Sequence, residues 1–307
     1  MQQTVVVSDA WEVWLAGFED SQQVQGRSEK TRIAYHRELR LLISILLQQT
    51  PDLRLNDVTN NHLMTAFTNE AITGTYRGTP RSPATLHRLK AATQQFFLWA
   101  FHSGHIADNP AQRLQSQRLY RKPPTFLTDA EITRLRKVLQ GRTGDVVQRD
   151  CLILEVFLGT GIRLQELVDL KIEDVDLEAK HLHIRSAKGG VPQVKFLHTR
   201  LRGLLRTYLK WRVRQGTEQC LALFISQRDT RISPRQIAYR LAYWLREAGI
   251  DKPLTPHSLR HTFATRLYAR TNDLLVVQRA LGHRQIATTE IYTHLVDGAL
   301  EEALERL

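Results

Sequence analysis

The chain has 307 residues, of which 42% are hydrophobic and 24% charged, as in folded globular domains, so a largely disordered chain is excluded. Its 43 lysines and arginines outnumber 31 acidic residues, and the net charge of +12 indicates a polyanionic partner, either nucleic acid or an anionic membrane surface. With only two cysteines, Cys151 and Cys220, one chain can build neither a disulfide framework nor a four-thiolate metal site.

The positive charge is concentrated in the second part of the chain. Residues 1–120 contain 12 basic and 10 acidic side chains, so residues 121–307 carry a net charge of +10. The amino terminus lacks the basic and apolar regions of a signal peptide, and the longest apolar run, residues 41–47, is too short to span a bilayer. We therefore predict a cytoplasmic protein with no membrane segment.

Residues 4 to about 118 are predicted to form a helical domain. Apolar residues recur at helical spacing in three segments, which end at Pro51, at a Thr-, Gly- and Pro-rich loop, and at Asn109-Pro110. The predicted helices cover residues 28–50, 58–71 and 85–101, and the loop covers residues 73–83.

Two groups of side chains in this domain have alternative interpretations. The aromatic side chains of Phe96, Phe97, Trp99 and Phe101 either fill a core or form a stacking platform for bases, and their spacing favours the core. Four basic residues around the loop either contact phosphates or form an ordinary solvated face: Arg77, Arg81, Arg88 and Lys90.

A linker and a second domain follow. Residues 118–124, R-L-Y-R-K-P-P, are basic and contain two prolines that resist helix formation, which indicates an extended linker. Thr128 and Glu131 form a capping box at the start of the next predicted helix. The strongly apolar residues 151–158 then predict a central helix of the new domain.

The segment after this helix carries a candidate functional arginine. Gly159 and Gly161 are expected to break or bend the chain just before Arg163. Arg163 and Glu166 form either an ordinary surface ion pair or a carboxylate that orients a working guanidinium. Spacing alone favours the surface pair.

A β-hairpin is predicted next. Residues 181–185 alternate as a strand and residues 191–197 return as its partner, joined by an S-A-K-G-G turn in which Lys188 would ordinarily be a solubilising charge. His181 and His183 share one face of the strand, but no third ligand with suitable spacing accompanies them, so we predict a solvent-facing pair and no metal site. Basic amphipathic helices follow over residues 201–213 and 233–248.

The residues with the clearest chemistry lie between Thr255 and Thr293. His257 and Arg260 share one face if the segment is helical, and an apolar-periodic segment predicts a helix pair that returns His283 and then Tyr292 towards them. Tyrosine supplies an oxygen nucleophile, arginine a two-point clamp for phosphoryl oxygens, and histidine a proton carrier near neutral pH. Such a set can attack a phosphodiester without a metal.

Five short sequence motifs, in their order along the chain, resemble those of the tyrosine recombinase (phage integrase) family. They are T-G-I-R-L-Q-E-L at 160–167, A-K-G-G at 187–190, H-S-L-R-H at 257–261, L-G-H at 281–283 and T-T-E-I-Y-T-H at 288–294. The amino-terminal S-E-K-T-R-I-A-Y at 28–35 is similar to the opening of the family's helical core-binding domain. Leu164 and Gln165 depart from many relatives, without consequence for the chemistry.

The resemblance implies a role for six residues and no cofactor. They are Tyr292 as nucleophile, Arg163 and Arg260 as phosphate clamp, Lys188 as general acid for the leaving 5′ oxygen, His257 for proton handling, and His283 as a hydrogen-bond donor to the phosphate. The implied intermediate is a 3′-phosphotyrosyl link, which conserves the energy of the cleaved phosphodiester bond for the rejoining step. That agrees with the absence of a G-x-x-x-x-G-K-[ST] nucleotide-binding loop from the sequence.

The resemblance also implies fold and partner. We expect a mainly α protein with a small antiparallel β-sheet: a two-domain clamp on double-stranded DNA, with a core-binding domain over residues 1–117, a linker over 118–124 and a catalytic domain over 125–307. A dimer would bind each site and a homotetramer two paired sites, with or without accessory DNA-bending proteins. The early start of the core-binding half favours a simple, Xer-like or transposon-resolvase-like recombinase.

Two other functions share part of this chemistry. A type IB topoisomerase would use the same residue types to relax DNA without paired sites. A non-catalytic DNA-binding regulator would explain the positive net charge but not the presence of the five motifs in the family's order.

The last residues, 297–307, predict a short amphipathic helix. Leu300, Ala303, Leu304 and Leu307 form one apolar stripe opposite three glutamates. Because so short a helix is marginal in water, the stripe should dock either on its own domain or on a neighbouring copy. The resemblance favours the neighbouring copy.

Overall fold

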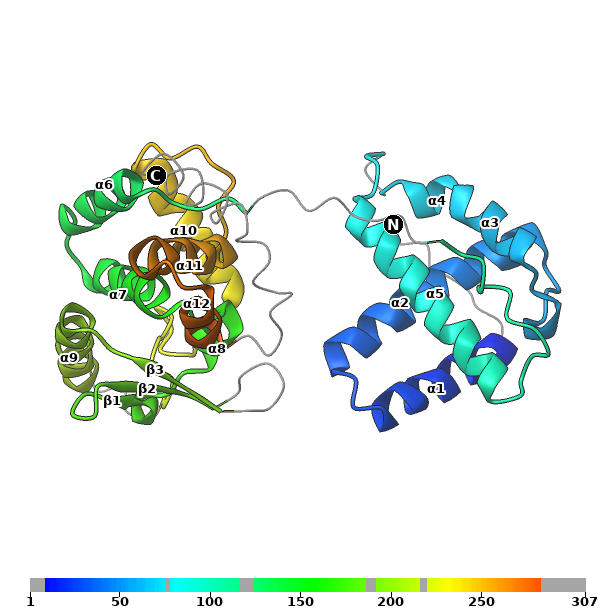
Figure 1. The fold of residues 1–307 in the computed structure, drawn as a ribbon, viewed down its shortest axis with the longest axis horizontal. Coiled ribbons are helices and arrows are strands. Elements are labelled where there is room, and N and C mark those ends of the chain that lie inside the picture. Colours follow the sequence, from blue (N-terminus) through cyan, green and yellow to red (C-terminus); the bar gives the residue numbers. More distant parts are fainter. Residues whose placement is uncertain (1–8, 76–77, 116–123, 186–191, 216–219, 283–307) are drawn as a thin grey trace, which may run out of the picture. The chain divides into compact units, whose positions relative to one another are not determined.

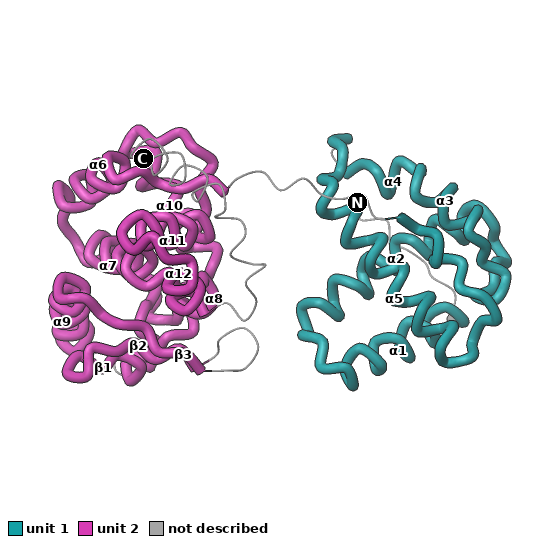
Figure 2. The backbone as a smooth tube through the Cα atoms, viewed as in Figure 1, with its two compact units in different colours: residues 1–121 teal, residues 122–307 magenta. Residues whose placement is uncertain are grey.

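The chain forms two compact units, residues 1–121 and 122–307, each with its own hydrophobic core (Figure 2). The computed structural model describes residues 9–75, 78–115, 124–185, 192–215 and 220–282. All of the predicted linker except Pro124 therefore lies outside the described residues. The domain boundaries, and the roles assigned to the two domains, stay predictions.

Unit 1 is helical, as Figure 1 shows. Its elements are α1 (Asp9–Val24), α2 (Glu29–Gln49), a 3-10 turn (Leu55–Asp57), α3 (Asn60–Thr68), α4 (Glu70–Thr73) and α5 (Pro83–His102). Helix α2 packs against both α1 and α5, and its N-cap Ser28 accepts a hydrogen bond from the Thr31 amide. Phe96 and Phe97 are fully buried in the core and Trp99 packs against it, so the core interpretation is confirmed for these three residues. It is wrong for Phe101, whose side chain is 41% exposed near the end of α5.

Helix α5 differs from its prediction at both ends. It begins at Pro83 behind the N-cap Ser82, because proline fits the first helical position, where its missing N–H costs nothing. It ends at His102, where Gly104 adopts a left-handed φ of +72°, and not at Asn109-Pro110. The helix predicted over residues 58–71 is likewise divided, because Asn69 ends α3 and caps α4.

The basic side chains around the loop make contacts within unit 1. Arg81 donates to the Gly74 carbonyl at 2.6 Å, and Arg88 pairs with the buried Glu38 at 2.5 Å. Lys90 donates to the Gln115 carbonyl at 3.3 Å. Arg77 lies outside the described residues, and whether these residues contact phosphate stays a prediction.

Unit 2 combines helices with a small antiparallel sheet, so the predicted fold class is confirmed (Figure 1). Its elements are α6 (Asp129–Gln140), α7 (Asp145–Thr160), α8 (Leu164–Asp169), a 3-10 turn (Ile172–Asp174), β1 (Val175–Asp176), β2 (His181–Ile184), β3 (Gln193–Phe196), α9 (Thr199–Arg214), α10 (Pro234–Glu247), α11 (Pro256–Thr271) and α12 (Leu274–Leu281). The mostly buried α7 is central, with α6, α9, α10 and α11 packed against it.

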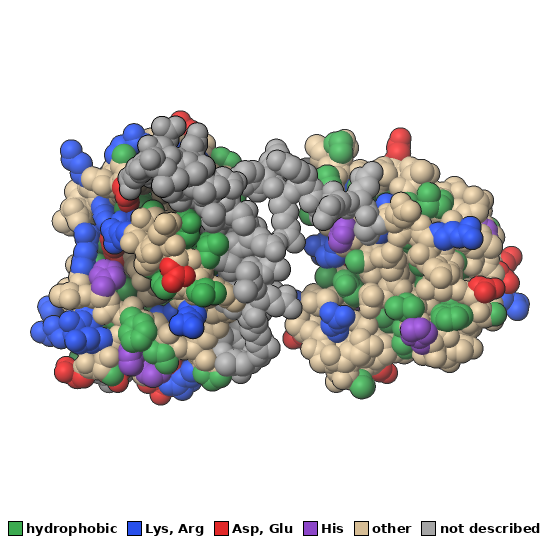
Figure 3. Space-filling view, in the orientation of Figure 1, with side chains coloured by type: hydrophobic (Ala, Val, Ile, Leu, Met, Phe, Trp, Pro, Cys, Tyr) green, Lys and Arg blue, Asp and Glu red, His purple; other side chains and the backbone are tan. Residues whose placement is uncertain are grey.

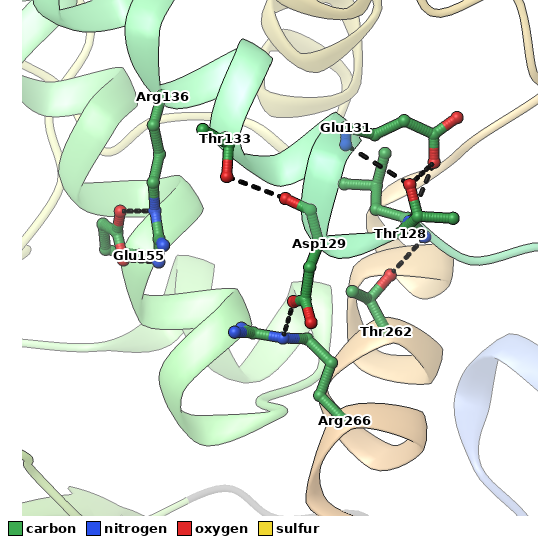
Figure 4. Close-up of polar contacts among 9 residues, drawn as sticks. Thr128, Asp129, Glu131, Thr133, Arg136, Glu155, Thr262 and Arg266 are labelled. Carbon is green, nitrogen blue, oxygen red and sulfur yellow. Dashed lines mark hydrogen bonds and ion pairs between the residues drawn. The ribbon is translucent and has the colours of Figure 1, made fainter. Parts of the chain in front are cut away.

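The capping box predicted at the start of α6 is confirmed. The Glu131 carboxylate accepts from the Thr128 amide at 2.8 Å, and the Thr128 hydroxyl accepts from the Glu131 amide at 3.3 Å (Figure 4). Next to it, the Leu127 amide donates to the Thr262 hydroxyl of α11 at 2.9 Å. The beginning of α6 is therefore fixed to the helix that carries two of the candidate site residues.

The sheet has the order β1-β2-β3, with His181 opposite Phe196 and His183 opposite Val194. The sequence did not predict β1, because two residues are too short to show alternation. His183 is exposed and His181 lies against the Phe196 ring, which agrees with a solvent-facing pair. None of the described helices is long and apolar enough to cross a membrane.

Candidate active site

The turn that leads into the candidate site depends on Gly161. Helix α7 runs through Gly159 without a break, contrary to the prediction for that residue, and ends at Thr160. Gly161 follows with a left-handed φ of +61°, and a Cβ there would lie 2.3 Å from the Phe263 ring. Glycine is therefore required both for the backbone conformation and for space, and the turn delivers Arg163 to the start of α8.

Arg163 is held by the buried carboxylate of Glu166. Glu166 accepts one hydrogen bond from the Arg163 amide at 2.9 Å and a second from its Nη1 at 2.7 Å. The Glu166 side chain is 3% exposed and that of Arg163 is 24% exposed, so the pair is not the surface ion pair that spacing favoured. A buried acceptor with two contacts orients the guanidinium and leaves part of it accessible.

Arg260 joins three segments that are distant in sequence. It is almost fully buried on α11. Its Nη1 donates to the Gly161 carbonyl at 2.6 Å and its Nη2 to the Leu281 carbonyl at 2.8 Å. The first carbonyl follows α7 and the second belongs to the last residue of α12, so Arg260 fixes both helix ends beside α11.

His257 belongs to the same electrostatic cluster. Partial burial of its ring, and then the positive charges of Arg260 and Arg163, lower the pKa of His257. The His261 ring packs edge-on against it with centroids 4.7 Å apart; burial, His257 and Arg260 lower the pKa of His261 to about 4. Both imidazoles are therefore mainly neutral at pH 7, and His257 is able to accept a proton.

The predicted helix pair is present as α11 and α12, packed against each other. Gly282 caps α12 with a left-handed φ of +66°, and a Cβ there would lie 2.2 Å from the Gln193 side chain of β3. The glycine of L-G-H therefore lets β3 approach the end of α12. The structure brings Arg163, His257 and Arg260 together, whereas Lys188, His283 and Tyr292 lie outside the described residues.

One charged residue of this cluster, Lys195 on β3, is not among the residues predicted from the sequence. Its side chain is buried, and its Nζ donates to the Ala280 carbonyl of α12. Burial first, then Arg260 and Arg163, with Glu166 acting in the opposite direction, lower the pKa of Lys195 to about 8. Strand alternation places Lys195 on the same face as the buried Leu197, a signal that could have identified it.

This arrangement suits an anion better than a metal ion. Arg163, Arg260 and Lys195 bring three cationic groups together against the carboxylate of Glu166. No group of three or more His, Cys, Asp or Glu side chains able to hold a metal occurs in the described part of the chain. A phosphate group would reduce the mutual repulsion of these cationic side chains and could accept hydrogen bonds from their N–H groups.

Comparison with known proteins gives concordant results. The model of the phage integrase family matches residues 125–298. A relative named tyrosine recombinase XerC, from Thermodesulfovibrio yellowstonii, is 34% identical over 70% of this chain and 72% of its own length. Another so named, from Mycobacterium sp. strain JLS, is 33% identical over 94% of each chain. The solved structure of a lambda integrase tetramer bound to a Holliday junction has a TM-score of 0.66 and 21% identity, covering 91% of this chain and 78% of that one.

Proposed function

Since the chain belongs to the phage integrase family and is a tyrosine-type site-specific DNA recombinase, we propose that six residues form its active site. They are Arg163, Lys188, His257, Arg260, His283 and Tyr292. The described geometry supports the proposal for three of them, because Arg163, His257 and Arg260 converge from α8 and α11 on one cationic site. On this proposal the protein acts on DNA at the nucleoid, in the cytoplasm.

The proposed reaction is a transesterification. The Tyr292 oxygen attacks the scissile phosphorus, the phenolic proton passes to His257, and the bond from phosphorus to the 5′ oxygen breaks as Lys188 protonates that oxygen. A phenol with an ordinary pKa of about 10 is a weak nucleophile at pH 7. Arg163 and Arg260 would lower the barrier by stabilising the negative charge that develops on the phosphoryl oxygens.

A paired assay tests the function. The protein should exchange strands between two copies of its site, selected from host DNA by binding, and should need neither ATP nor a divalent metal. A protein that relaxes supercoiled DNA without any paired site would instead be acting as a type IB topoisomerase. Site-specific binding without any covalent adduct would indicate a regulator.

Lys188→Ala should slow cleavage of ordinary DNA far more than cleavage of a 5′-phosphorothiolate substrate, because a thiolate leaves without protonation. The measurement is single-turnover adduct formation on both substrates. Lys210→Met, which changes an exposed lysine of α9, is the matched control and should slow neither reaction. Equal slowing of both substrates by Lys188→Ala would remove its role as general acid.

We further propose that copies of the chain assemble as a tetramer on two sites through the tail, residues 297–307. The tail sequence is acidic with an apolar stripe. Unit 2 has a pocket of about 370 Å³ between α6, α7, α9 and α11, and its apolar and basic lining is complementary to the apolar and acidic side chains of the tail. Its apolar walls include Leu158, Phe263 and Leu267, and its basic residues include Arg200, Arg266 and Arg270.

The charges of this pocket are partly balanced within unit 2. Arg136 makes two hydrogen bonds, of 2.6 and 2.8 Å, to the buried Glu155, and Arg266 pairs with Asp129 at 2.7 Å (Figure 4). Figure 3 shows Lys and Arg side chains over the α6, α7 and α9 side of unit 2. The excess of basic groups supports this pocket as the acceptor for the acidic tail of another copy.

Ending the chain after Leu295 should leave single-site binding nearly intact but strongly reduce strand exchange between two sites. A double variant, Arg200→Glu with Arg270→Glu, should have the same effect, and tail changes Glu301→Lys and Glu302→Lys should restore its exchange in part. Gel-shift affinity and recombinant yield measure the two properties. A truncated protein with wild-type yield would contradict docking on a neighbour, and loss of folding would indicate docking within the same chain.

A further inference from the structure

Strand β3 faces the last turn of α12 with two polar side chains. Gln193 and Lys195 point inward, whereas Val194 and Phe196 on the other face are 47% and 75% exposed. The Lys195 Nζ donates to the Ala280 carbonyl, and the Gln193 Nε2 lies 3.5 Å from the Gly282 carbonyl, a weak hydrogen bond. Both acceptors belong to the end of α12, where the helix dipole favours a cation.

Packing alone does not explain a lysine at this position. A buried ammonium loses its hydration, and here Arg163 and Arg260 repel it while Glu166 offers the opposing charge. A methionine of similar length would fill the same space without these costs. The property that methionine lacks is the charged donor, and that donor is directed at the α12 carbonyl.

We propose that Lys195 is a positioning residue of the active site, which with Gln193 fastens β3 to the last turn of α12. Strand β3 follows the segment that contains Lys188, and the end of α12 directly precedes His283. The fastening therefore fixes the end of the segment that supplies the general acid relative to the start of the segment that supplies His283 and Tyr292. The inference rests on the function proposed above for those three residues.

The charged state of Lys195 links this contact to pH. The groups that face it are Arg260 from α11, Arg163 and Glu166 at α8, and the Ala280 carbonyl from α12. Its pKa is about 8 in the folded protein against an ordinary 10.5, so between these values the folded chain has lost a proton that the unfolded chain keeps. The free energy of unfolding therefore increases as pH rises from about 8 to about 10.5. At pH 7 the buried ammonium of Lys195 lowers the stability of the folded chain.

Three variants separate positioning from simple packing. Lys195→Met removes the donor and the charge, Lys195→Arg keeps both at every accessible pH, and Lys210→Met is the exposed control. The readouts are single-turnover adduct formation on a nicked substrate at saturating protein from about pH 6.5 to about 9.5, melting temperature, and amide hydrogen exchange of residues 274–282.

We expect Lys195→Met to form the adduct roughly 10- to 100-fold more slowly, since small misplacements of reacting groups have effects of this size. Its melting temperature should not fall, because a buried charge is removed, while amides at the end of α12 should exchange faster. We expect the wild-type rate to decline as pH rises through about 8, where Lys195 loses its charge. Lys195→Arg should react near the wild-type rate at pH 7 and should lack this decline.

Wild-type rate and wild-type exchange in Lys195→Met would overturn the inference, as would the same alkaline decline in Lys195→Arg. If Lys195→Met does not fold, Gln193→Ala replaces it and should also accelerate exchange at the end of α12. Failure of the wild type to form any adduct would contradict the proposed function instead. The exchange measurement would still decide whether Lys195 fastens β3 to α12.

Discussion

Tyr292→Phe is expected to abolish the covalent protein–DNA adduct while leaving DNA affinity within a few-fold of the wild type. The change removes only the hydroxyl, so it eliminates the attacking oxygen and leaves the phosphate-binding groups in place. The measurement is adduct yield from a nicked substrate on a denaturing gel, together with a gel shift. Tyr239→Phe, at an exposed position of α10, is the matched control and should give full yield. Undiminished adduct from Tyr292→Phe would refute its role.

Arg163→Ala should slow the cleavage step by roughly 10²- to 10³-fold, the usual cost of losing one preorganised donor to a developing oxyanion. The variant should fold, because the Arg163 amide continues to donate to Glu166 at 2.9 Å. Arg163→Lys should recover only part of the rate, since an ammonium cannot contact both the carboxylate and a phosphoryl oxygen in the geometry of a planar guanidinium.

The control for this series is Arg206→Ala, at an exposed position of α9. It tests whether loss of any basic residue of unit 2 has the same effect through weaker DNA attraction. Single-turnover rates at saturating protein separate the chemical step from binding. A rate for Arg163→Ala within a few-fold of the wild type would contradict the proposed phosphate clamp.

Local sequence signals predicted most of the fold. Helical periodicity located α2, α5, α7, α9 and α10, and the predicted Thr128 capping box located the start of α6, where Thr128 accepts a hydrogen bond from the Glu131 amide. The predictions were wrong at proline and glycine residues, because each of these residue types occurs both in loops and within or at the start of helices. Pro83 looked like part of a loop although it begins α5, and Gly159 looked like a helix break although α7 continues through it.

The candidate site was predictable only in its local parts. The His257 and Arg260 pair lies on one helix, so spacing sufficed. By contrast, the burial of Glu166 depends on the packing of unit 2, and the Arg260 contacts with Gly161 and Leu281 join residues that spacing cannot relate. Strand alternation could have indicated that Lys195 is buried, but not its contact with the Ala280 carbonyl, because the two residues are 85 positions apart.

Identification of the amino acid that becomes linked to DNA tests the central claim most directly. The adduct formed on a nicked substrate would be digested with protease and nuclease, and the peptide that retains a nucleotide would be sequenced by mass spectrometry. We predict one modified peptide, with the nucleotide attached to Tyr292 through a 3′ phosphate. A nucleotide on any other side chain, or one attached through a 5′ phosphate, would contradict the proposed reaction.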